Sequence, residues 1–150
     1  MGPTKAGPLK TLVEDFGTRI GRYLPFEWVS VPDVRSKGRP TPDSLKELES
    51  EALLRHLEPG DQVVLLDENG AGYSSRKFAA QLQKWMNAGP KRLVLVIGGA
   101  YGFGSGVRSR ADAQLSLSRM TFNHQVVRLM AAEQLYRALT ILRGEPYHND

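Results

Sequence analysis

Residues 93–104 read LVLVIGGAYGFG, an apolar run that ends in a cluster of glycines. The β-branched and apolar residues at its start are typical of a buried strand. Because Gly98 and Gly99 have no Cβ, the backbone there can adopt dihedral angles closed to other residues, and a flat ligand can lie directly against the peptide groups. The stretch therefore predicts a strand that ends at a pocket.

A second apolar run over residues 62–66 predicts another buried strand, and a helix between the two strands makes the fold α/β. Ser74 or Ser75 can cap this helix, and Gly89-Pro90 ends it. Strand, helix and strand in this order predict a parallel pair with a right-handed crossover. The apolar stripe of the helix consists of Phe78, Leu82, Trp85 and Met86.

The remaining elements follow from the same patterns. Apolar spacing predicts helices over 9–24 and 107–113, and a cap at Thr41 followed by Pro42 predicts one that continues to about residue 57. Alternation predicts a strand over 26–31, and a further short strand is expected over 115–117. Polar segments at 33–40 and 67–70 are predicted to be loops, and a long helix is expected from His124 to Arg143, ended by Gly144.

Composition limits the class of protein. With 150 residues, 41% of them hydrophobic, the chain can bury one compact core, so we expect a single domain over 1–150. The formal charge of +4 and the pI near 9.5 favour an anionic partner without requiring one. The sequence contains no cysteine, which excludes disulfides and thiolate ligands, and we expect no bound metal. There is no signal-peptide pattern and no membrane-length apolar run, so a cytoplasmic location is expected.

The glycine cluster does not follow the known phosphate-binding patterns. A dinucleotide fingerprint that begins at Gly104 and Gly106 would need a third glycine where Ser109 stands. No Gly-Lys-Ser/Thr sequence occurs either. The plain alternative is an ordinary turn between a strand and a helix.

Two further segments give the glycine cluster a context, LSLSRMTFNH at 115–124 and PYHND at 146–150. Together with residues 93–104, they resemble the bacterial 23S rRNA pseudouridine-N3 methyltransferases of the SPOUT class, over most of the chain. The resemblance implies a mainly parallel sheet flanked by helices, with a trefoil knot in the C-terminal half. Family members normally open with an apolar strand. Here residues 2–5 correspond to the loop after it, so we expect the first strand to be lacking through a misassigned start, trimming or true variation.

The resemblance also implies a cofactor and a substrate. S-adenosylmethionine would lie among three loops, and its methyl group would go to N3 of a pseudouridine in the intersubunit-bridge stem-loop of 23S rRNA, in assembled ribosomes. The family forms homodimers through the last helix, whose apolar residues cover more than one stripe and would alternatively suit a core helix. The implied cofactor-binding residues are Leu66, Gly98, Leu117, Ser118, Arg119, Met120, Thr121 and Phe122.

Three residues of this sequence could take part in removing the N3 proton. His124 stands at a predicted helix start, where the plain alternative is a capping-region residue. Tyr147 and His148 lie in the tail, which would ordinarily be disordered, but the family's Tyr-His tail reaches the active site of the neighbouring subunit. Any of the three could act as base or orienting group, and loss of the proton to water is a further route.

Two basic groups are candidates for phosphate contact with the RNA, although such clusters are usually only solvated. Two other functions are open at this point: a ribosome-binding or assembly factor without catalysis, and a Rossmann-like enzyme that uses a nucleotide. The basic groups are Arg35, Lys37 and Arg39 in one loop, and Arg108 and Arg110 after the glycine cluster.

Overall fold

The computed structural model describes residues 2–34 and 39–149. A parallel sheet of three strands stands at its centre, in the order β2-β1-β3. The strands are β1 (Asp61–Gly72), β2 (Arg92–Ile97) and β3 (Ala113–Ser116). The predicted parallel α/β arrangement is therefore confirmed, with the strand predictions for 62–66, 93–97 and 115–117 close to the observed elements.

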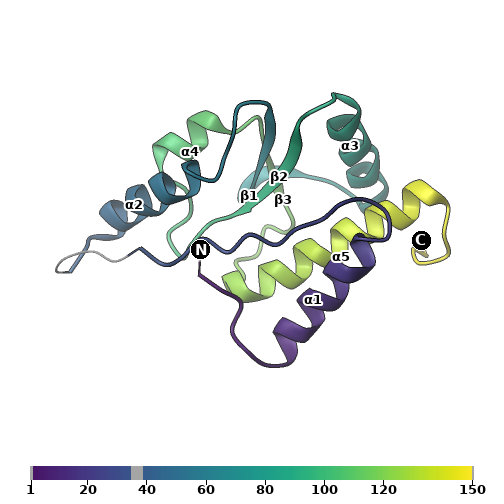
Figure 1. The fold of residues 1–150 in the computed structure, drawn as a ribbon, viewed down its shortest axis with the longest axis horizontal. Helices are drawn as coiled ribbons and strands as arrows, with labels where there is room; N and C mark the ends of the chain where they lie inside the picture. The colour runs from purple at the N-terminus through teal and green to yellow at the C-terminus, as the bar shows by residue number, and fades with distance from the viewer. Residues whose placement is uncertain (1, 35–38, 150) are drawn as a thin grey trace.

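Helices cover both faces of this sheet (Figure 1). The strand residues alternate between two apolar clusters: Val64 belongs to the cluster with α3 and α5, whereas Val63 and Leu65 belong to the cluster with Leu53 of α2. This alternation is what a sheet buried on both faces requires. The helices are α1 (Pro8–Ile20), α2 (Pro42–Leu54), α3 (Ser75–Asn87), α4 (Ser105–Arg110) and α5 (His124–Arg143).

Local signals in the sequence fix several helix ends. The side chain of Ser74 accepts a hydrogen bond from the amide of Lys77, and that of Asn123 accepts one from Gln125 at 2.8 Å. Gly144 ends α5 in the left-handed conformation, with φ of 68°. These caps place the start of α5 directly after the loop that follows β3.

The predicted strand over 26–31 is wrong. These residues form no strand, and their alternating pattern is satisfied by side-chain packing instead. Phe26 and Trp28 stack edge to face with centroids 5.3 Å apart, and Val31 is buried, with its carbonyl accepting a hydrogen bond from Gly2. Apolar alternation here marks neither a strand nor a fully buried segment, because Phe26 is only half-buried and Trp28 is 38% exposed.

The predicted loop over 67–70 is also wrong, because β1 continues to Gly72. The pairing of β1 with β3 shifts register between Leu66 and Ala71, both of which pair with Leu115. Such a bulge bends the strand and changes where its side chains point. The predicted helices over 9–24 and 107–113 end earlier than expected, at Ile20 and Arg110. No helix in the described ranges is long and apolar enough to cross a membrane.

Substitution of Gly70 tests whether the bulge needs a residue without a side chain at this position. A Cβ at this position would lie 2.6 Å from the amide nitrogen of Leu115 and 2.7 Å from its carbonyl carbon, so the β3 backbone itself would have to move. We expect Gly70→Ala to lower the free energy of unfolding by about 1–3 kcal/mol, as overpacking does. Denaturant titration of both proteins measures this difference.

Gly72 provides the matched control in the same strand, because a Cβ there would have no neighbour within 4 Å. Gly72→Ala should leave the unfolding midpoint close to that of the wild type. Equal destabilisation by the two substitutions would contradict the packing argument.

Candidate active site

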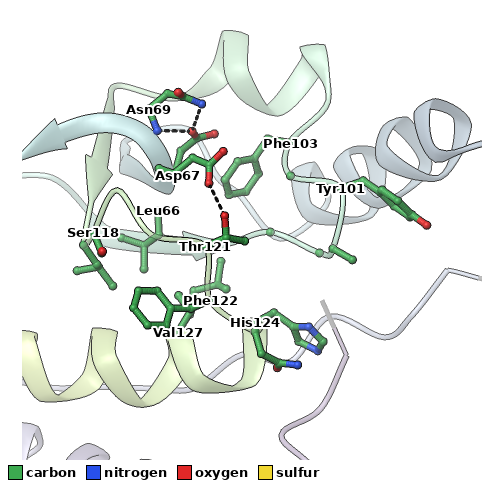
Figure 2. A pocket seen from close by; sticks show the side chains of 18 of the residues that line it. Leu66, Asp67, Asn69, Tyr101, Phe103, Ser118, Thr121, Phe122, His124 and Val127 are labelled. Atoms are coloured by element: carbon green, nitrogen blue, oxygen red, sulfur yellow. Dashed lines mark hydrogen bonds between the residues drawn. The ribbon is translucent and has the colours of Figure 1, made fainter.

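A cavity of about 570 Å³ lies at the carboxyl ends of the strands, where parallel α/β sheets bind ligands. Three loops and the start of α5 form its wall (Figure 2). Of the predicted cofactor-binding residues, all but Arg119 line it; Arg119 is exposed outside the wall. The lining residues that were predicted are Leu66, Gly98, Leu117, Ser118, Met120, Thr121 and Phe122, together with His124.

The glycine cluster shapes one side of this cavity. The amide of Gly102 donates a hydrogen bond to the carbonyl of Gly99 at 3.2 Å, and Gly102 has a φ of +78°, which favours glycine. A Cβ at Gly98 would lie 3.2 Å from both the Gly102 carbonyl oxygen and the ring of Phe103. The turn therefore folds back closely on the end of β2.

Two acidic residues, Asp67 and Glu68, also line the cavity, and they were not predicted from the sequence. The Asp67 carboxylate accepts hydrogen bonds from the Asn69 amide at 2.9 Å and from Arg108 Nη2 at 2.7 Å. Burial of Asp67 raises its pKa, but these hydrogen bonds lower it by more, so that the pKa lies below its ordinary value. Glu68 accepts a hydrogen bond from the Thr121 hydroxyl at 3.3 Å. The only available signal was two acids directly after a buried strand.

Two of the basic residues proposed to contact RNA, Arg108 and Arg110, have contacts within the chain. The Nε of Arg108 donates to the Phe103 carbonyl at 3.1 Å, so this guanidinium belongs to the cavity wall. Arg110 donates to the carbonyl oxygens of Glu58 and Asp61 at 3.2 and 2.9 Å. Arg39 is exposed. Arg35 and Lys37 lie outside the described residues.

The tail is not part of the cavity in its own chain. The Tyr147 hydroxyl donates to Glu133 Oε1 at 3.3 Å, and the guanidinium carbon of Arg137 lies 4.8 Å from the centroid of the Tyr147 ring. Arg137 Nη1 lies 3.3 Å from His148 Nδ1. Figure 1 shows the C-terminus at the end of α5 opposite to its start. The tail and the cavity therefore lie near opposite ends of one helix.

His124 is the first residue of α5 and lies at the edge of the cavity (Figure 2). Burial, and then the positive charge of Arg128, lower the pKa of its imidazole below the ordinary value of 6.5. The side chain is therefore neutral at pH 7, the form that can accept a proton.

We expect an NMR titration of the His124 ring protons to show a midpoint below pH 6.5. Because the unfolded chain binds the proton more tightly than the folded chain, this histidine's contribution to stability is complete above pH 6.5. It is lost as the pH falls from there through the folded pKa. A midpoint at or above 6.5 would contradict the lowered pKa.

Comparison with known proteins identifies the family of this chain. The family described as "Predicted SPOUT methyltransferase" matches residues 1–148, so the chain belongs to the SPOUT methyltransferase family, as its sequence suggested. Among the relatives, it is 44% identical over 150 residues to the "Ribosomal RNA large subunit methyltransferase H" of Parabacteroides distasonis, covering 100% of this chain and 96% of the relative. Proteins of the same name from Christiangramia forsetii and Flavobacterium johnsoniae are each 46% identical over 149 residues, covering 99% of this chain and 95% of the relative.

Proposed function

We propose that this protein transfers a methyl group from S-adenosylmethionine to N3 of a pseudouridine in the intersubunit-bridge stem-loop of 23S rRNA. The observation that carries the proposal is the nearly full-length similarity to proteins named ribosomal RNA large subunit methyltransferase H. The cavity at the carboxyl ends of the strands is a second, independent support.

The residues of the cavity fit this cofactor better than a nucleotide. Leu66, Leu117 and Phe122 offer apolar surface for an adenine ring, and the peptide groups around Gly98 can approach it closely. The charge of Asp67 is paired with that of Arg108, so Glu68 is the acidic group of the wall that suits a ligand with a sulfonium and an ammonium group and disfavours a polyphosphate. When bound, the cofactor supplies an electrophilic methyl carbon, so the protein contributes mainly alignment and exclusion of water.

The N3 proton of the neutral imide has to leave before or during transfer, and the candidate groups differ in their ability to accept it. Burial and Glu133 raise the pKa of Tyr147, so its phenol stays protonated at neutral pH and its hydroxyl donates to Glu133. Tyr147 is therefore a poor base. The neutral imidazole of His124 beside the cavity suits the role better.

A homodimer would join the two separated parts of the site. The 20 residues of α5 span about 30 Å, and an antiparallel pair of such helices about a two-fold axis places the tail of each chain near the start of the other's α5. Phe122 and Val126 at that start are each 39% exposed, and Leu12 on α1 is 46% exposed. Membership of the family also implies a trefoil knot in the C-terminal half, and we propose that this chain forms it.

RNA recognition would then fall to the surface of the dimer. The chain carries a formal charge of +4, and Arg39 is exposed for phosphate contact. The described residues surround one sheet, with no second domain beside it for RNA. A large, preassembled substrate such as the ribosome, in the cytoplasm, suits so small a protein.

The test is transfer of a labelled methyl group to assembled ribosomes that lack the modification, followed by nuclease digestion. We expect the label in N3-methylpseudouridine. Label in another nucleoside would change the substrate, and cofactor binding without transfer would favour a non-catalytic ribosome-binding factor. Stabilisation by NAD or ATP, but not by S-adenosylmethionine, would favour a nucleotide-dependent enzyme.

A further inference from the structure

We propose that Tyr101 and Lys5 receive the RNA at the rim of the cavity. In this arrangement an unpaired base beside the target nucleotide stacks on the Tyr101 ring, and Lys5 contacts a phosphate group. The proposal rests on the proposed function, because it takes RNA as the substrate. It follows from an exposed aromatic ring and an exposed cation at this rim, neither of which is engaged by the rest of the described chain.

Tyr101 lies at the tip of the glycine turn. The turn spans residues 99–102 and is closed by the hydrogen bond from the Gly102 amide to the Gly99 carbonyl. Tyr101 is 50% exposed although it lines the cavity, and Figure 2 shows its side chain directed outward, away from the centre of the cavity. Among residues 2–34 and 39–149 its ring stacks on no other ring and its hydroxyl has no hydrogen bond. One aromatic face is therefore available to a ligand.

The other aromatic residue of this segment has the opposite environment. Phe103 is only 4% exposed and packs in the apolar cluster that includes Val63 and Leu65 of β1. Phe103 therefore fixes the turn to the core. Tyr101 is the aromatic side chain of the turn that a partner in solution can reach.

Lys5 places a positive charge near the same rim. Its backbone amide donates to Gln125 Oε1 at 3.1 Å, beside His124 at the start of α5, and Arg128 of the same helix donates to the Thr4 hydroxyl at 3.0 Å. These bonds hold the segment that carries Lys5 against the edge of the cavity. After burial and the charge of Arg128, the charge of Lys5 also lowers the pKa of His124. The Lys5 side chain is exposed, and its amine has no ion pair in the described ranges.

The rim and the interior of the cavity differ in charge, and this difference separates the RNA from the cofactor. Glu68 inside the cavity suits a cationic ligand, whereas Lys5 outside it suits a phosphate group, the part of the RNA that positions it without specifying sequence. Bases of RNA loops unstack readily and stack on exposed aromatic rings. Tyr101 and Lys5 can therefore hold the nucleotide beside the target, which leaves the cavity to the cofactor and the target base.

Substitutions of Tyr101 test the stacking. We expect Tyr101→Ala to raise the KM for ribosomes about tenfold or more, because stacking on one base contributes affinity on this scale. Tyr101→Phe keeps the ring and should stay within about twofold of the wild type, and in both variants kcat and the Kd for S-adenosylmethionine should change by less than about twofold. Tyr73 is the matched control, since it is 38% exposed but outside the cavity wall, so Tyr73→Ala should leave the KM for ribosomes unchanged.

Substitutions of Lys5 test the phosphate contact through its salt dependence. We expect Lys5→Gln to make the plot of log affinity for ribosomes against log salt concentration shallower by about one, as the loss of one phosphate contact does. Lys5→Arg keeps the charge and should keep the wild-type slope. Lys84 on α3 is also exposed but lies outside the cavity wall, so Lys84→Gln should keep that slope as well.

Each part of the inference has a result that would overturn it. An unchanged KM in Tyr101→Ala, or an equal rise in Tyr101→Phe, would overturn the stacking, and an unchanged slope in Lys5→Gln would overturn the phosphate contact. A weaker dimer in sedimentation velocity would assign the substituted residue to the subunit interface instead, and a loss of cofactor affinity equal to the rise in KM would assign Tyr101 to the cofactor site. A wild-type protein that methylates no rRNA would overturn the proposed function itself.

Discussion

Gly98→Val should lower the affinity for S-adenosylmethionine by about 30-fold or more, which corresponds to roughly 2 kcal/mol. A Cβ at this position already lies 3.2 Å from the Gly102 carbonyl oxygen and from the Phe103 ring, closer than ordinary van der Waals contact. The two further methyl groups of valine would have to displace the turn or enter the cavity that Gly98 lines. Isothermal titration calorimetry measures the affinity.

The control again comes from β1. Gly72→Val introduces the same side chain where a Cβ has no neighbour within 4 Å, and Gly72 is not part of the cavity wall. It should bind the cofactor as the wild type does, and circular dichroism should show that both variants are folded. If Gly98→Val bound S-adenosylmethionine with wild-type affinity, the cavity would not be the cofactor site.

The sequence allowed the centre of the cavity to be predicted because its chemistry is local. An apolar run that meets Gly98 needs only neighbouring residues to be interpreted, and the same is true of the caps at Thr41 and Ser74. Asp67 could not be predicted as a cavity residue, because its place depends on the register shift between β1 and β3. That shift is a property of the pairing with Leu115, far along the chain.

One wrong prediction and one contact that was not foreseen have the same physical origin. Residues 26–31 alternate as a strand does, but the pattern does not say whether a partner with free backbone groups lies beside them. From the sequence alone, Arg108 was interpreted as a cation for RNA contact. Only the folded chain shows that its guanidinium donates hydrogen bonds to the carboxylate of Asp67 and to the Phe103 carbonyl. Long-range pairing of polar groups leaves little trace in a local pattern.

Two inactive variants should restore activity when their subunits are mixed, if each site takes its cavity from one chain and its tail from the other. Gly98→Val damages only the cavity, and His148→Ala damages only the tail, which lies near the opposite end of α5. Each homodimer alone should show about 3% of wild-type methyl transfer or less at limiting S-adenosylmethionine, given the losses expected for a blocked ligand site and for a lost active-site group. Transfer of labelled methyl to ribosomes measures the activity.

Random exchange of subunits in an equal mixture makes half of the dimers heterodimers. Each of these has one site with an intact cavity and an intact tail, and one site with neither, so the mixture should recover roughly a quarter of the wild-type activity. If each chain completed its own site, the mixture would stay as inactive as its parents, because no chain in it has both parts. Recovery therefore depends on the one arrangement in which His148 of either chain can reach the other's cavity, and its absence after confirmed subunit exchange would contradict the shared site.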